Sequence, residues 1–143
     1  MRRYDVVRSS PPVVVAFGTT RAELFEHAAF AMFDLGYDLS AVPSTYSRPV
    51  VAPGDTWSEL LRNWLDELLF LSKREGLVWS SFAVDRLEEG GVQGSAGGMP
   101  AGEVPLRNEQ VSAVETPHPS LVAVPEGWRV ELEFSTRRRL RPV

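Results

Sequence analysis

The clearest pattern in the chain is an apolar stripe in residues 57–69 that repeats every three or four positions. It consists of Trp57, Leu60, Leu61, Trp64, Leu65, Leu68 and Leu69. This spacing is typical of an amphipathic α-helix that packs one face into a core. Thr56 and Glu59 form a capping-box pattern before the stripe, and Gly76 follows it. The pattern therefore predicts a helix between Thr56 and Gly76.

A second apolar stripe predicts a helix between Thr20 and Gly36, and Thr20 with Glu23 repeats the capping-box pattern. The apolar face comprises Leu24, Phe25, Ala28, Ala29, Met32 and Phe33. His27 lies beside this stripe. We expect a partly exposed, structurally neutral histidine there, in preference to a ligand or a base.

Apolar and charged residues alternate strictly from residue 128 to residue 134, which predicts a strand with one face in water. Further apolar or alternating runs predict strands at residues 4–7, 13–17, 47–52, 77–87, 92–98, 111–116 and 121–124. Pro49 places the strand at residues 47–52 on a sheet edge. Three glycines weaken the strand at residues 92–98, and a hairpin turn (EEGG) at residues 88–91 precedes it.

The order of these elements is β, α, β, α and then only β. It predicts an α+β fold, a two-layer sandwich in which two amphipathic helices cover one face of a mostly antiparallel sheet. Residues 1–136 are expected to form a single domain, because 143 residues are enough for one core of ordinary size.

Composition narrows the functional classes. The chain has no cysteine, which excludes disulfides, thiolate metal sites and cysteine nucleophiles. No run of 18 apolar residues predicts a transmembrane helix, so no membrane partner is expected, and the first residues lack the apolar segment of a signal peptide. A cytoplasmic protein is the expectation that follows.

Charge is uneven along the chain. The formal net charge is −4, yet residues 137–143 carry four arginines, Arg137, Arg138, Arg139 and Arg141, which leaves −8 for the remainder. Such a basic tail is usually a solvated terminus. The alternative is contact with phosphate, either of RNA or of a ribonucleoprotein partner.

The residues supply no recognisable catalytic constellation. His27 and His118 lack the spacing of metal ligands, and the glycine-rich segment at residues 91–102 does not lead into a helix as a phosphate loop would. The carboxylate pairs Glu88/Glu89 and Glu131/Glu133 fall on a turn and on the wet face of a strand. The residues alone therefore favour a protein that is not an enzyme.

Several stretches together resemble the archease family, in the same order and with matching gaps. They are residues 17–29 (FGTTRAELFEHAA), 31–35 (AMFDL), 57–69 (WSELLRNWLDELL), 75–84 (EGLVWSSFAV), 111–116 (VSAVET) and 127–128 (GW). The resemblance implies an archease-like fold and a non-catalytic accessory role. Archeases assist RtcB-type RNA ligases in tRNA splicing and RNA repair, so the implied partner is such a ligase.

The chain departs from the family pattern where archeases hold a divalent metal such as calcium. The resemblance aligns the acidic ligand positions with Pro11 and with the pair Ser135-Thr136, and it aligns a family lysine with Ser112. Divalent cations such as Ca²⁺ need hard oxygen donors, usually carboxylates, so we expect no metal or other cofactor here.

Two hypotheses follow from this departure. The first is an accessory protein that activates an RtcB-type ligase by promoting its guanylylation and turnover, with the basic tail, Arg137, Arg138, Arg139 and Arg141, touching the ligase or RNA. The second is a degenerate, metal-free homologue that acts as a protein-binding module or adaptor without a role in ligation.

Overall fold

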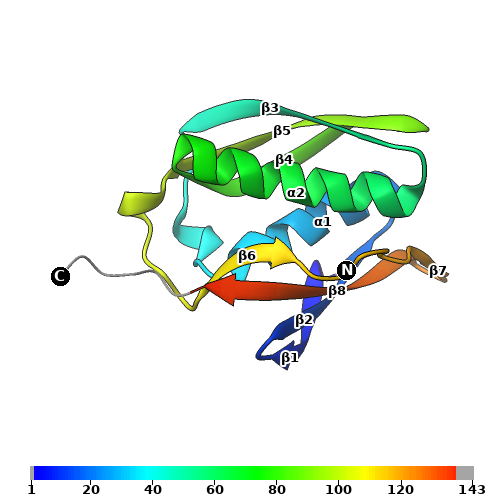
Figure 1. Ribbon diagram of the computed structural model, residues 1–143, viewed down its shortest axis with the longest axis horizontal. Coiled ribbons are helices and arrows are strands. Elements are labelled where there is room, and N and C mark those ends of the chain that lie inside the picture. The colour runs from blue at the N-terminus through cyan, green and yellow to red at the C-terminus, as the bar shows by residue number, and fades with distance from the viewer. Residues whose placement is uncertain (1, 138–143) are drawn as a thin grey trace.

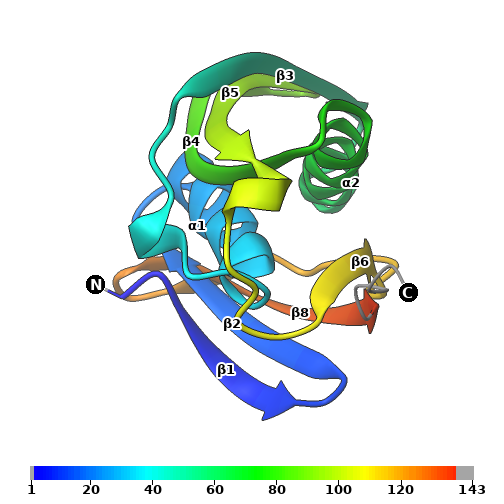
Figure 2. The same cartoon turned by 90° about the vertical axis from the view of Figure 1, so that its left-hand side faces the viewer.

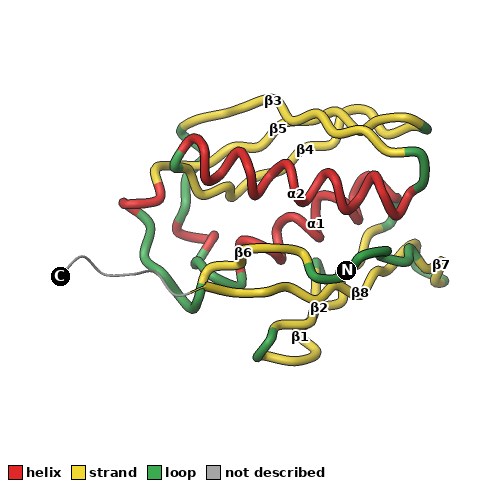
Figure 3. Tube along the Cα trace, viewed as in Figure 1, coloured by secondary structure: helices red, strands yellow, loops and turns green. Residues whose placement is uncertain are grey.

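In the computed structural model, which describes residues 2–137, two α-helices lie between two antiparallel sheets (Figures 1 and 2). The strands are β1 (Tyr4–Ser9), β2 (Pro12–Gly18), β3 (Tyr46–Gly54), β4 (Leu77–Glu88), β5 (Gly90–Pro100), β6 (Gln110–Val114), β7 (Val122–Val124) and β8 (Gly127–Arg137). The helices are α1 (Arg21–Asp34) and α2 (Trp57–Glu75), and the short 3₁₀ turns are η1 (Leu39–Ala41) and η2 (Ala101–Glu103). Figure 3 shows how loops connect these elements.

The α+β class and the antiparallel pairing are confirmed, but the strands form two sheets instead of one. The larger sheet has the order β1-β2-β8-β6, with β7 also paired to β8, and the smaller sheet has the order β3-β5-β4. Helix α1 packs against β4 and β2, and α2 packs against β3 and β6, so both helices contact both sheets. Apolar faces seen in the sequence do not reveal that a helix has a sheet on each side.

Both helices begin at their predicted caps, and α2 also ends at its predicted glycine, whereas α1 ends at Asp34 with Leu35 as its C-cap. The hydroxyls of Thr20 and Thr56 accept from the backbone N–H of Glu23 and Glu59, each over 3.1 Å. The carboxylate of Glu23 returns to the N–H of Thr19, and this hydrogen bond holds the pKa of Glu23 below its usual range. Gly76 ends α2 in the left-handed conformation, at φ 66°.

The core lies where the two helices meet the two sheets. Its largest fully buried side chains include Trp64, Trp79, Phe25 and Phe134. Each indole N–H in this set is satisfied by a helix carbonyl: Trp64 donates to Phe25 and Trp79 donates to Leu68, both over 3.1 Å. The predicted inner face of α2 is thereby confirmed.

Helix side chains cover two of the sheet edges. The guanidinium of Arg62 on α2 donates to the carbonyls of Val114, at the end of β6, and of Thr116 just after it. The carboxylate of Glu26 on α1 accepts from the N–H of Val84 on β4. Pro49 lies on β3, which is an edge strand as predicted. These contacts tie each helix to the edge of a neighbouring sheet, where unpaired backbone groups would otherwise remain.

No helix within residues 2–137 combines the length and apolarity needed to cross a membrane.

Candidate functional site

One end of the larger sheet brings together the positions that the family resemblance singles out. Val13 on β2 pairs with Glu133 on β8, and Pro11 lies in the turn just before β2, on the side where β8 continues to Ser135. On the other side of β8, Val111 pairs with Thr136. Pro11, Ser135 and Thr136 therefore lie near one another, although more than 120 positions separate Pro11 from the other two.

Hydroxyl groups occupy the positions Ser112, Ser135 and Thr136, which the resemblance aligns with charged residues of the family. The hydroxyl of Ser112, on the position of the family lysine, lies 3.3 Å from both the carbonyl oxygen and the hydroxyl of Ser135. The hydroxyl of Thr136 donates to the carboxylate of Glu109 over 2.7 Å.

A cavity of about 300 Å³ opens beside these residues. It is lined by Ser9, Ser10, Pro12, Leu35, Asn108, Glu109 and Thr136. Among the described residues of this lining, Glu109 is the one carboxylate. The sequence reasoning missed it because Glu109 follows an irregular segment, and its only signal is its place directly before the strand β6.

The donor groups at this end do not fit a divalent metal. The only oxygen of Pro11 is its carbonyl, and this already accepts from Nε of Arg8 over 3.1 Å. The same guanidinium pairs with the Glu133 carboxylate over 2.9 Å. A fixed positive charge thus lies where a cation would have to approach. Within residues 2–137, no three His, Cys, Asp or Glu side chains gather as a metal site requires.

The loop that carries Glu109 is tied to the end of α1. The N–H of Arg107 donates to the carbonyl of Gly36 over 2.7 Å, and its guanidinium pairs with Asp38 over 3.1 Å and Asp34 over 3.7 Å. The hydroxyl of Tyr4 on β1 donates to Asp34 over 2.6 Å, and burial together with this carboxylate raises the pKa of Tyr4 well above its usual value. The cavity is therefore framed by β1, α1 and this loop.

The remaining predicted residues lie elsewhere. Nδ1–H of His27 donates to the carbonyl of Phe17 over 2.6 Å, as suits a structural histidine. His118 is exposed in the loop before β7. Arg137 is the last residue of β8, one residue inside the predicted tail 137–143, and it is exposed. Arg138, Arg139 and Arg141 lie outside the described residues.

The carboxylate pairs of the sequence separate into different environments. Glu88 pairs with Arg86 over 3.1 Å at the β4–β5 hairpin, whereas Glu133 pairs with Arg8 on the larger sheet. Neither pair builds an acid–base site at the cavity described above.

Comparison with known proteins gives one consistent family. The model of the Archease protein family (MTH1598/TM1083) matches residues 13–132. A protein archease of Methanosarcina barkeri is 29% identical over 123 residues, covering 82% of this chain and 84% of that protein. A protein archease of Methanothermobacter thermautotrophicus is 37% identical over 102 residues, covering 69% of this chain and 73% of that protein.

Solved structures show the same fold. The solution structure of Methanobacterium thermoautotrophicum protein 1598 superposes with a TM-score of 0.80 at 28% identity, covering 94% of this chain and 99% of that one. The crystal structure of a Thermotoga maritima archease, described as a possible chaperone, gives a TM-score of 0.57 at 11% identity, covering 95% and 98%. The second likeness is one of fold alone.

Proposed function

This chain belongs to the archease family, and from that premise we propose that it is an accessory protein that activates an RtcB-type RNA ligase. In this role it promotes guanylylation and turnover of the ligase in tRNA splicing or RNA repair, in the cytoplasm. The observation that carries the proposal is the retention of the whole scaffold, with a TM-score of 0.80 over 94% of the chain.

The proposed role is that of a binding protein without chemistry of its own. Relatives are named archease, and one solved relative is described as a possible chaperone, which is consistent with action through protein contact. The cavity at Ser9 and Thr136 is the candidate contact, because its lining includes Thr136, which the resemblance aligns with a family ligand, and Pro12, which follows Pro11. Arg137 at the end of β8 leads from this cavity toward the basic tail, which would reach ligase or RNA phosphates.

Because the donors at Pro11 and Ser135 do not fit a divalent cation, the proposed activation does not depend on a metal held by this chain. Arg8 supplies a permanent positive charge at the same place, bonded to the Pro11 carbonyl and to Glu133. A guanidinium also presents several N–H donors in a fixed plane, which suits carboxylate or phosphate groups of a partner.

One observation favours a second function. With both aligned acidic positions replaced, by Pro11 and Ser135, the chain has the features of a metal-free homologue that binds a protein partner but does not promote ligation. This adaptor keeps the scaffold and loses the activity, since fold and function separate readily.

A multiple-turnover ligation assay tests the proposal. The RtcB-type ligase from the same organism is held limiting, with GTP and Mn²⁺, and turnover is measured with and without this protein. We expect a clear gain. The variant Ser9→Trp, which fills the cavity mouth, should lose the gain, whereas Ser120→Trp in the exposed loop before β7 should keep it.

The two functions give different results in this assay. Binding of the ligase in a pull-down without any gain in turnover would favour the adaptor. Neither binding nor gain would leave only the fold in common with the family and would overturn both functions as stated for this ligase.

A further inference from the structure

A second cavity, of about 450 Å³, lies between the start of α2 and the tip of the β4–β5 hairpin. Figure 1 shows that these two segments lie at the end of the molecule opposite the end of β8. The cavity is lined by Asp55, Thr56, Trp57, Leu60 and Glu89. Its volume is in the range of sites that hold a ligand or a large side chain. It shares no lining residue with the cavity at Ser9 and Thr136.

The aromatic wall of this cavity is fixed in place. The guanidinium of Arg21, at the start of α1, lies 4.5 Å from the ring centre of Trp57 and 4.2 Å from that of Trp128. Arg21 thus binds two indoles from different elements. Because this contact restricts its rotamer, Trp57 presents a preformed surface to the cavity.

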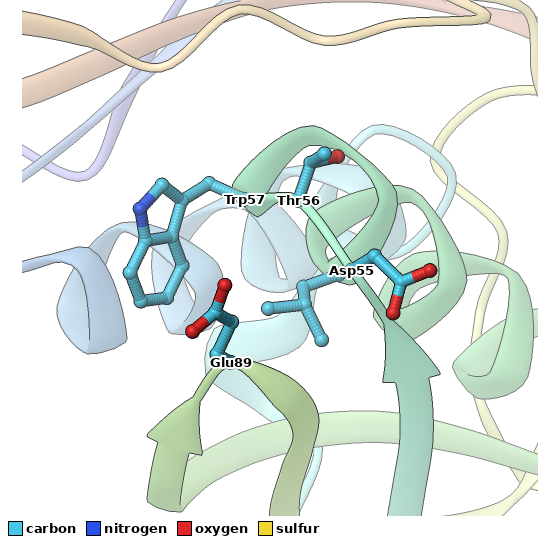
Figure 4. A pocket seen from close by; sticks show the side chains of 5 residues that line it. Asp55, Thr56, Trp57 and Glu89 are labelled. Atoms are coloured by element: carbon cyan, nitrogen blue, oxygen red, sulfur yellow. The ribbon is translucent and has the colours of Figure 1, made fainter.

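The carboxylates of this cavity are unpaired. Within residues 2–137, the side chains of Asp55 and Glu89 make no hydrogen bond or ion pair, whereas neighbouring Glu88 pairs with Arg86. Figure 4 shows the Glu89 carboxylate directed toward the Trp57 ring, while Asp55 lies at the opposite rim with its carboxylate turned outward. The cavity thus combines an aromatic surface, an apolar floor and two solvent-exposed carboxylates without a partner among residues 2–137.

We propose that this cavity binds the cationic side chain of a partner protein, a lysine or arginine whose charged group lies between Trp57 and Glu89. An aromatic ring attracts a cation through its quadrupole, and a carboxylate beside it adds a charge-assisted hydrogen bond. Buried aromatic and charged anchors of this kind dominate many protein interfaces. We take this partner to be the RtcB-type ligase, and this part of the inference rests on the proposed function.

The cavity is tested first without any partner. Acetyl-arginine amide is titrated into ¹⁵N-labelled protein, and the indole N–H signal of Trp57, identified with Trp57→Phe, is followed by NMR. Acetyl-citrulline amide, which has the same shape without the charge, is the matched ligand. We expect a saturable shift with arginine amide and none with citrulline amide. Equal responses to both, or none to either, would overturn the proposal.

Single substitutions show which carboxylate of the cavity contributes to binding of arginine amide. We expect Glu89→Gln to weaken binding of arginine amide about tenfold, and Asp55→Asn to weaken it less, since its carboxylate points away from Trp57. Glu103→Gln removes the same charge from an exposed residue of η2 and should leave binding unchanged. Unchanged affinity in Glu89→Gln would contradict the proposed geometry.

A second experiment measures binding of the RtcB-type ligase itself in a pull-down. If wild type retains the ligase in a pull-down and Glu89→Gln retains it equally, the cavity is not the contact, and the proposed function stands. If wild type fails to retain the ligase while Trp57 still responds to arginine amide, the ligase is the wrong partner and the cationic site stands. Weaker retention by Glu89→Gln than by Glu103→Gln supports both.

Discussion

Arg8 shows how one side chain can change the chemistry of an inherited site. The resemblance implies that archeases hold a cation with carboxylates at the positions of Pro11 and Ser135, and we propose that the Arg8 guanidinium supplies the positive charge here. Its guanidinium bonds the Pro11 carbonyl and the Glu133 carboxylate, and so links the β1–β2 turn to β8. Because this charge cannot dissociate, the arrangement does not depend on metal concentration.

The stability of the core depends strongly on the single buried ring of Trp64. It is fully buried, and its indole N–H donates to the carbonyl of Phe25. Trp64→Ala should lower the free energy of unfolding by about 3–5 kcal/mol, since it leaves a large cavity in the core. Denaturant melts measure this loss. Phe70→Ala on the exposed side of α2 is the control, and a loss below about 1 kcal/mol for Trp64→Ala would show that the core face is misassigned.

At the scale of elements, β5 is the strand whose role the sequence obscures most. Its glycines weaken the pattern, yet it lies at the centre of the smaller sheet, paired with β3 and β4 along its length. The reason is close approach: a Cβ on Gly98 would lie 1.9 Å from the carbonyl oxygen of Val78 on β4. Glycine is required here by the neighbouring strand.

Gly98→Ala should therefore destabilise the protein by about 1–3 kcal/mol or more, because β4 has to move away from β5. Thermal and denaturant unfolding measure the change. Gly102→Ala is the matched control, since a Cβ there meets no atom within 4 Å, and it should stay within about 0.5 kcal/mol of wild type. Equal stability of the two variants would contradict the close packing of β5 on β4.

Arg62 links α2 to the edge of the larger sheet and should therefore contribute to the free energy of unfolding. Its guanidinium donates to the carbonyls of Thr116 and Val114 over 2.8 and 3.1 Å. Arg62→Met should cost about 1.5–3 kcal/mol in denaturant melts, since both carbonyls lose a charged donor. Asp66→Asn, which removes only the exposed ion-pair partner at 3.6 Å, should cost less than about 1 kcal/mol. A comparable loss in both variants would assign the effect to the ion pair instead.

For the whole molecule, the sequence predicted the elements better than their assembly. Caps and apolar periodicity located α1 and α2, because these signals are local. The division into two sheets depends on pairing between distant segments, such as β2 with β8, and no local pattern encodes it. On α1, Ala31 is fully buried although it lies outside the predicted apolar stripe, and so small a side chain gives little sign in the sequence of a second buried face.

The site was predictable only through the family resemblance. That resemblance identified Pro11, Ser135 and Thr136, and the structure brings them to one end of the larger sheet. It assigned no role to Arg8 or Glu109, because a charged residue on a short exposed strand and one in a loop resemble ordinary surface positions. The cavity at Trp57 was missed for a related reason: Trp57 was assigned to the core stripe of its helix, and Glu89 to a turn.

The stability of the whole fold should not depend on a metal ion. An ion bound to the folded state alone would stabilise the entire molecule. A Ca²⁺ site with a Kd of about 10 µM would add about 2.7 kcal/mol at a free Ca²⁺ concentration of 100 times Kd. We expect the unfolding midpoint of this protein to be the same in Ca²⁺ and in chelator. The triple variant Arg8→Gln/Pro11→Asp/Ser135→Asp removes the guanidinium and restores two carboxylates, and its midpoint should rise with Ca²⁺. A Ca²⁺-dependent rise in the unmodified protein would instead show that Glu109 and the neighbouring hydroxyls suffice to hold the ion.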